Sequence, residues 1–102
     1  MKNDPYKHTY KDLPDQLVKT HKNLKFENHC YLRIALDNVF QNKWDTLIKK
    51  PAYKHLTQDK LAKVLELLEL YLGDIDVLLQ HNKNSLNWRK KANVQPRQRQ
   101  LF

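Results

Sequence analysis

Two charged residues lie where a hydrophobic face is expected, and they are the residues most able to do chemistry. When segment 29–49 is projected as a helix at about 100° per residue, Arg33 falls inside the apolar arc and Asp37 at its edge. Burying a charge without a partner is costly, so each side chain needs a counter-charge, hydrogen bonds or a ligand. The two residues therefore indicate either a structural ion pair or a binding site for an anion.

A second predicted helix, over 74–91, carries a matching irregularity. Asn82 lies in the middle of its apolar face, and Arg89 follows two turns later. In a bundle in which this helix runs parallel to 29–49, these polar groups come to similar heights. The favoured interpretation is an internal network that fixes helix register. The alternative is a cleft for an anionic ligand, with these candidate binding residues: Arg33, Asp37, Trp44, Asn82 and Arg89.

The C-terminal end of the chain offers a different kind of site. Residues 83–102 carry six basic and no acidic groups, whereas residues 57–82 carry two basic and five acidic groups. Phosphate contacts need positive charge and little geometry, so this end predicts contact with nucleic acid or with an acidic protein. A merely solubilising terminus is the alternative. The candidate nucleic-acid-binding residues are Trp88, Arg89, Lys90, Lys91, Arg97 and Arg99, with Trp88 as a possible stacking ring.

Metal binding and nucleophilic catalysis have little support in the sequence. The five histidines are scattered, and none forms the i, i+4 pair that places two imidazoles on one helix face. Cys30 lies on an apolar strip, where a free cysteine is typically a small hydrophobic residue. His81 precedes Ser85 by one turn, but no pattern of an oxyanion hole accompanies them. We therefore expect no metal and no cofactor, and we favour a protein that is not an enzyme over one that is.

Composition predicts a single all-α domain. The chain of 102 residues contains one glycine, which argues against tight β-hairpins and glycine-rich phosphate loops. No apolar stretch is long enough to cross a membrane, no signal-peptide pattern is present, and the lone cysteine is typical of a reducing compartment. We expect a cytoplasmic protein with a net charge of +8 and no membrane contact. The oligomeric state is left open.

The helical pattern predicts a three-helix bundle with a short additional N-terminal helix. Residues 1–12 have no period and are expected to be flexible, as is the basic tail over 92–102, which leaves 13–91 as the domain. The short helix begins at Leu13, with Pro14 in its first turn. The main helices are expected over 29–49, 57–72 and 74–91.

Capping residues mark the ends of these helices. Asn28 and Thr57 are the expected N-caps of the first two, Pro51 follows the first, and Gly73 is expected to end the second in a left-handed conformation. Apolar spacing predicts the buried residues of the last two helices. These are Leu61, Val64, Leu65, Leu68 and Leu72, followed by Ile75, Leu78, Leu79 and Leu86.

Several short motifs resemble those of a group of small bacterial helical proteins. The matching stretches are CYLRIALDN, KWD and NSLNWR, within residues 28–91. Some proteins of this group carry the label acetyltransferase, which would place an anionic ligand near Arg33, Asp37 and Asn38. The residues themselves do not support that activity, because the common acetyl-CoA-binding fold needs a β-sheet and a glycine-rich pyrophosphate loop.

Three functions remain in view. The first is an interaction protein whose basic C-terminal end contacts an acidic partner, most plausibly nucleic acid. The second is a helical adaptor that binds another protein through exposed leucines. The third is the activity implied by the resemblance, with an anionic ligand held in a cleft of arginines and tryptophans.

Overall fold

The computed structural model describes the backbone from Pro5 to Leu101 and the side chains from Tyr10 to Lys91. This part of the chain is helical and contains no strand, which confirms the all-α class. Residues 92–102, for which the sequence predicts a flexible tail, lie outside the described side chains. The elements are α1 (Pro5–Thr20), η1 (Lys22–Leu24), α2 (Asn28–Phe40), η2 (Trp44–Thr46), η3 (Ala52–Lys54), α3 (Gln58–Gly73) and α4 (Ile75–Leu101).

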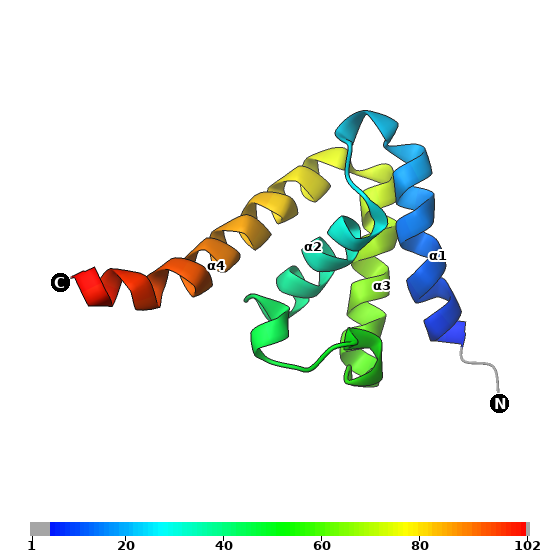
Figure 1. Cartoon of the computed structure of the whole chain (residues 1–102). Helices are drawn as coiled ribbons and strands as arrows, with labels where there is room; N and C mark the ends of the chain where they lie inside the picture. The colour runs from blue at the N-terminus through cyan, green and yellow to red at the C-terminus, as the bar shows by residue number, and fades with distance from the viewer. Residues whose placement is uncertain (1–4, 102) are drawn as a thin grey trace.

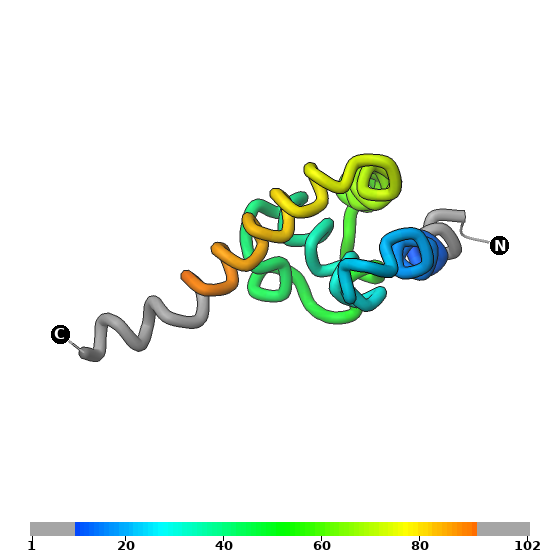
Figure 2. The backbone as a smooth tube through the Cα atoms, turned by 90° about the horizontal axis from the view of Figure 1, so that it is seen from above, coloured from blue at the N-terminus to red at the C-terminus, as the bar shows by residue number. Residues whose placement is uncertain are grey.

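The helices pack as two pairs that share a core. Helices α1 and α3 lie side by side and run in the same direction, and seen from above both are nearly end-on (Figures 1 and 2). Helix α4 leaves the end of α3 at an angle and runs alongside α2 (Figure 1). Helices α2 and α3 each contact the other three helices, so these two form the centre of the bundle.

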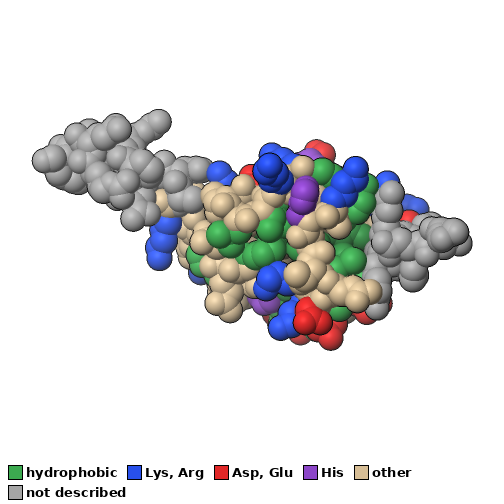
Figure 3. All heavy atoms as spheres, turned by 90° about the horizontal axis from the view of Figure 1, so that it is seen from below, with side chains coloured by type: hydrophobic (Ala, Val, Ile, Leu, Met, Phe, Trp, Pro, Cys, Tyr) green, Lys and Arg blue, Asp and Glu red, His purple; other side chains and the backbone are tan. Residues whose placement is uncertain are grey.

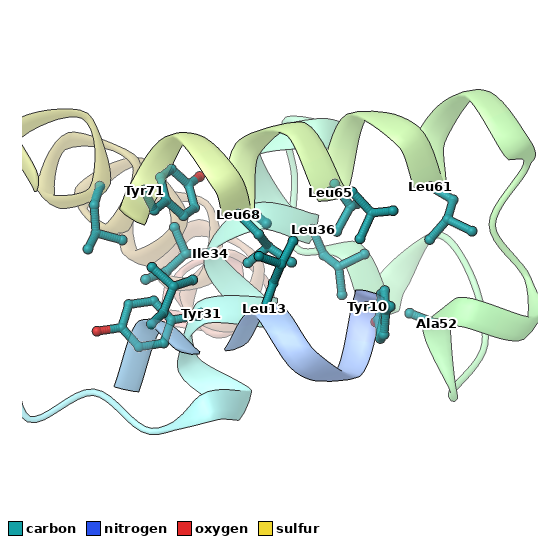
Figure 4. Close-up of a cluster of buried hydrophobic side chains, with 14 residues drawn as sticks. Tyr10, Leu13, Tyr31, Ile34, Leu36, Ala52, Leu61, Leu65, Leu68 and Tyr71 are labelled. Atoms are coloured by element: carbon teal, nitrogen blue, oxygen red, sulfur yellow. The ribbon is translucent and has the colours of Figure 1, made fainter. Parts of the chain in front are cut away.

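Apolar residues at helical spacing build the core between α1, α2 and α3. Figure 4 shows these side chains pointing toward one another from the three helices. Burying one such side chain contributes roughly 1.5–3 kcal/mol relative to leaving it exposed. The fully buried members are Leu17 of α1, Tyr31, Ile34 and Ala35 of α2, Val64, Leu68 and Tyr71 of α3, and Leu78 of α4.

The start of α3 is as predicted, and its end is not. Thr57 is the N-cap, and its hydroxyl accepts a hydrogen bond from the backbone N–H of Lys60 at 3.2 Å. Gly73, however, has no positive φ, and the chain leaves the helix through Asp74 in an extended conformation. Asp74 then accepts a bond from the N–H of Val77 and so caps α4. Asp74 thus ends α3 through its backbone N–H, which donates to the carbonyl oxygen of Leu70, and begins α4 through its side chain.

Helix α1 begins earlier than the sequence predicts. It starts at Pro5 rather than Leu13, and it contains Pro14 in its interior. Tyr10, which was assigned to a flexible segment, is only 6% exposed and packs in the core beside Leu13. Packing against α3 compensates for the backbone hydrogen bond that an internal proline removes.

Helix α2 ends earlier than predicted. It stops at Phe40, because Gln41 adopts a left-handed conformation with φ 55°, and the predicted helix over 29–49 is therefore wrong beyond residue 40. The N-cap is Glu27 rather than the predicted Asn28. Trp44 consequently lies in η2 and not on the same helix face as Arg33.

The residues predicted to form the apolar face of the last helix differ in their burial. Leu78 is buried, whereas Ile75, Leu79 and Leu86 are 41%, 43% and 52% exposed. The cause is that α4 meets α2 through polar side chains, which turns those three residues toward solvent. Among the described residues, no helix has the length and apolar character that a membrane crossing requires.

Candidate functional site: the polar interface of α2 and α4 and the cleft beside it

Asp37 is the centre of a buried polar network between α2 and α4. Its side chain is fully buried and accepts two hydrogen bonds from Arg89, Nε to Oδ2 at 2.7 Å and Nη2 to Oδ1 at 3.2 Å. Ser85 Oγ donates a third, to Oδ2, at 2.6 Å. A two-point bond between a guanidinium and a carboxylate fixes both distance and orientation, so this contact sets the register of the two helices.

Arg33 joins the same network without touching Asp37. Its Nη1 donates to Ser85 Oγ at 2.8 Å and its Nη2 donates to Asn82 Oδ1 at 2.9 Å. Ser85 therefore connects Arg33 to Asp37. The sequence predicted that Arg33, Asp37, Asn82 and Arg89 would meet, and the structure joins all four with α2 parallel to α4. It also shows that Ser85, which the sequence did not predict to bond with these four, is the bridging residue.

The loop after α2 is attached to the same carboxylate. The backbone N–H of Trp44 donates to Asp37 Oδ1 at 3.0 Å, seven residues along the chain. Asp37 thereby satisfies a backbone group that the early end of α2 would leave unpaired. The predicted ligand residue Trp44 is thus held near Arg89, although not by helical spacing.

Asn38 extends the network toward the start of α4. Its Nδ2 donates to the carbonyl oxygens of Ile34 and His81, at 2.7 and 2.9 Å, and its Oδ1 accepts from Asn84 at 3.2 Å. Sequence reasoning placed Asn38 only by resemblance. The available signal was the adjacency of two polar residues, 37 and 38, beside an apolar stripe.

The side chain of His81 contacts Tyr71 and not Ser85. Its Nδ1 lies 2.7 Å from the hydroxyl of Tyr71, and the two rings meet edge to face. Burial raises the pKa of Tyr71, so its hydroxyl keeps its proton, and burial lowers the pKa of His81. Ser85 bonds to Asp37 and Arg33 instead, so the His81–Ser85 spacing does not produce a catalytic dyad here.

A surface cleft with a volume of about 500 Å³ lies beside the network. Three of the predicted ligand residues, Arg33, Trp44 and Arg89, line it, whereas Asp37 and Asn82 are not among its lining residues. On the face seen from below, hydrophobic patches are exposed between basic, histidine and other polar side chains (Figure 3). The other lining residues are Tyr10, His29, Leu32, Leu36, Asp45, Lys50, Pro51, Ala52 and Tyr53.

The predicted nucleic-acid residues differ in how available they are. Lys90 and Lys91 are exposed and Trp88 is half-buried. Arg89 is only 22% exposed and already binds Asp37, so it is a poor free ligand for phosphate. Arg97 and Arg99 lie outside the described side chains. Among the described residues, no three histidine, cysteine or acidic side chains form a group that could hold a metal ion.

Comparison of the chain with protein-family models, with curated proteins and with solved structures finds no match. The resemblance to small bacterial proteins and the activity that it implies therefore stay predictions.

Proposed function

We propose that this protein contacts nucleic acid through the basic C-terminal end of α4. The observation that carries the proposal is the separation of charge along the chain. Asp76 is the last acidic residue, and the following residues 77–102 carry six basic groups. Lys90 and Lys91 are exposed at the end of the described part of α4. Such a one-sided charge attracts phosphate backbones with little requirement for base sequence.

Salt dependence tests this proposal directly. Binding of a labelled single-stranded oligonucleotide should weaken steeply as salt rises, since each phosphate contact contributes about 0.7 to the slope of log affinity against log salt. Neutralising the basic end should weaken binding and flatten that slope. The variant carries four changes: Lys90→Gln, Lys91→Gln, Arg97→Gln and Arg99→Gln. Glutamine keeps helix propensity close to that of lysine and arginine.

A matched control removes the same charge from elsewhere on the surface. In this control variant, four exposed lysines are each changed to glutamine: Lys11, Lys19, Lys54 and Lys63. If the C-terminal end makes the contacts, the control keeps most of the wild-type affinity and slope. Equal losses in both variants would indicate only a general attraction by net charge, and would contradict the proposal.

A protein-binding adaptor is the second candidate, and one observation favours it. Ile75, Leu79 and Leu86 are exposed and lie at i, i+4 and i+11 on one face of α4. The polar changes Leu79→Gln and Leu86→Gln should abolish a protein contact made through this face and leave the salt-dependent oligonucleotide binding intact. Loss of oligonucleotide binding in this variant would instead assign that face to the nucleic acid.

A further inference from the structure

Among the cavities, side-chain clusters and surface patches, the cleft beside α2 and α4 combines the most features of a ligand site. Its volume of about 500 Å³ is within the range of small-molecule sites, roughly 300–1,000 Å³. Its walls come from α1, α2, α4 and the loop between α2 and α3. The apolar part of the lining includes Leu32, Leu36 and three aromatic residues, Tyr10, Trp44 and Tyr53.

The charges around this cleft leave one positive charge without a carboxylate. Three cations, Arg33, Lys50 and Arg89, face two carboxylates, Asp37 and Asp45, when histidine is neutral. Arg89 is neutralised by Asp37, and Lys50 lies 3.9 Å from Asp45. The excess charge therefore belongs to Arg33.

Arg33 is held in place by neutral groups. Its hydrogen-bond acceptors are a hydroxyl and an amide oxygen, and no carboxylate of the described residues lies within ion-pair distance. A guanidinium that is partly buried, oriented by two bonds and not neutralised is a good receptor for a planar monoanion, because it pays little ordering entropy on binding.

Asp45 supplies the complementary group. Its Oδ1 atom is buried and accepts no hydrogen bond in the described part of the chain, although it lies 3.8 Å from Arg89 Nη2. The carboxylate is 19% exposed and its two ion-pair contacts, at 3.8 and 3.9 Å, are longer than hydrogen bonds, so it favours a ligand with an N–H donor. The chain of contacts Arg33–Ser85–Asp37–Arg89–Asp45 attaches both groups to one rigid framework.

We propose that this cleft binds a free aromatic amino acid. The carboxylate pairs with Arg33, the ammonium group pairs with the Asp45 carboxylate in place of the exposed Lys50, and the ring lies against the apolar and aromatic lining. This site is separate from the proposed nucleic-acid contact and does not depend on it.

Three related compounds test the proposal on the full-length protein, by calorimetry and by the shift in melting temperature. L-Phenylalanine should bind and raise the melting temperature. 3-Phenylpropionate, which lacks the ammonium group, should bind about tenfold more weakly, and phenethylamine, which lacks the carboxylate, should not bind detectably. Absence of phenylalanine binding at millimolar concentration, or equal affinity for either of the other compounds, would overturn the proposal.

Two variants assign the roles of the charged residues. The variant Arg33→Gln should bind neither phenylalanine nor 3-phenylpropionate, because the carboxylate of both ligands pairs with Arg33. Asp45→Asn should weaken phenylalanine about tenfold and leave 3-phenylpropionate unchanged, so it tests the site even if Arg33→Gln fails to fold. Lys54→Gln, which changes an exposed lysine outside the cleft, is the control and should bind as the wild type does. A similar loss of both ligands in Asp45→Asn would contradict the assignment.

Discussion

Asp37 of α2 and Arg89 of α4 are joined by two hydrogen bonds across 52 positions of sequence, and the carboxylate is fully buried. The same carboxylate binds Ser85 and the backbone of Trp44. One side chain thus connects two helices and a loop. Its removal should affect the whole domain, because each of its partners would lose a charge-assisted bond.

Asp37→Ala should lower the free energy of unfolding by about 3–5 kcal/mol, since it leaves Arg89 partly buried without its counter-charge. Urea denaturation followed by circular dichroism measures the change. Glu66→Ala, at an exposed position of α3, is the control and should change stability by less than about 0.5 kcal/mol. A similarly small loss for Asp37→Ala would show that the network contributes little to stability.

Ser85→Ala tests the bridge between Arg33 and Asp37. The hydroxyl both donates and accepts, so its removal leaves two charged groups with one bond fewer each, and we expect a loss of about 1–3 kcal/mol. Thr46 offers a comparison, because its hydroxyl makes one bond in an exposed turn. Thr46→Ala should therefore be nearly neutral. Equal effects of the two changes would be inconsistent with a buried bridge.

Gln41→Gly tests where α2 ends. Gln41 has a φ of 55°, a conformation that costs an L-residue roughly 1 kcal/mol and that glycine adopts freely. The change should therefore stabilise the protein by about 0.5–1 kcal/mol. Were the helix continuous to residue 49, the same change would destabilise it by about 1 kcal/mol, as Lys63→Gly in the exposed middle of α3 should do. A stabilising effect of Gln41→Gly would support a helix that ends before residue 41, and a destabilising effect would contradict it.

This helix end shows what the sequence could and could not predict. Polar residues on an apolar face revealed Arg33, Asp37, Asn82 and Arg89, because unpaired burial is costly. The break at Gln41 was missed, since neither glycine nor proline marks it and apolar residues continue at helical spacing to Leu47. A side-chain bond takes the place of the helical backbone bond there, since the N–H of Trp44 donates to Asp37 Oδ1. The early start of α1 depends likewise on packing against α3.

The cleft could be predicted only in part. Arg33 and Arg89 were found because they interrupt an apolar stripe, but Asp45 and Lys50 were not. These two lie in the loop between α2 and α3, where no period relates them to the helices. Their positions follow from the folded loop, so only the structure brings them to the arginines.

His81 predicts how stability depends on pH. Its pKa lies below the ordinary value of 6.5 because burial disfavours the charged ring. The unfolded chain therefore binds a proton more readily than the folded protein does. The contribution of His81 to the free energy of unfolding is largest above pH 6.5. It decreases as the pH falls from that value toward the lower pKa of the folded state.

Comparison with a variant that does not titrate isolates this effect from the other four histidines. His81→Gln keeps an oxygen that can accept a bond from the Tyr71 hydroxyl, so the packing partner retains its contact. We expect the wild type to lose more unfolding free energy than this variant between about pH 7.5 and about pH 5 in urea denaturation. Parallel losses would mean that His81 titrates alike in the folded and unfolded states. A larger loss in the variant would reverse the sign that burial requires.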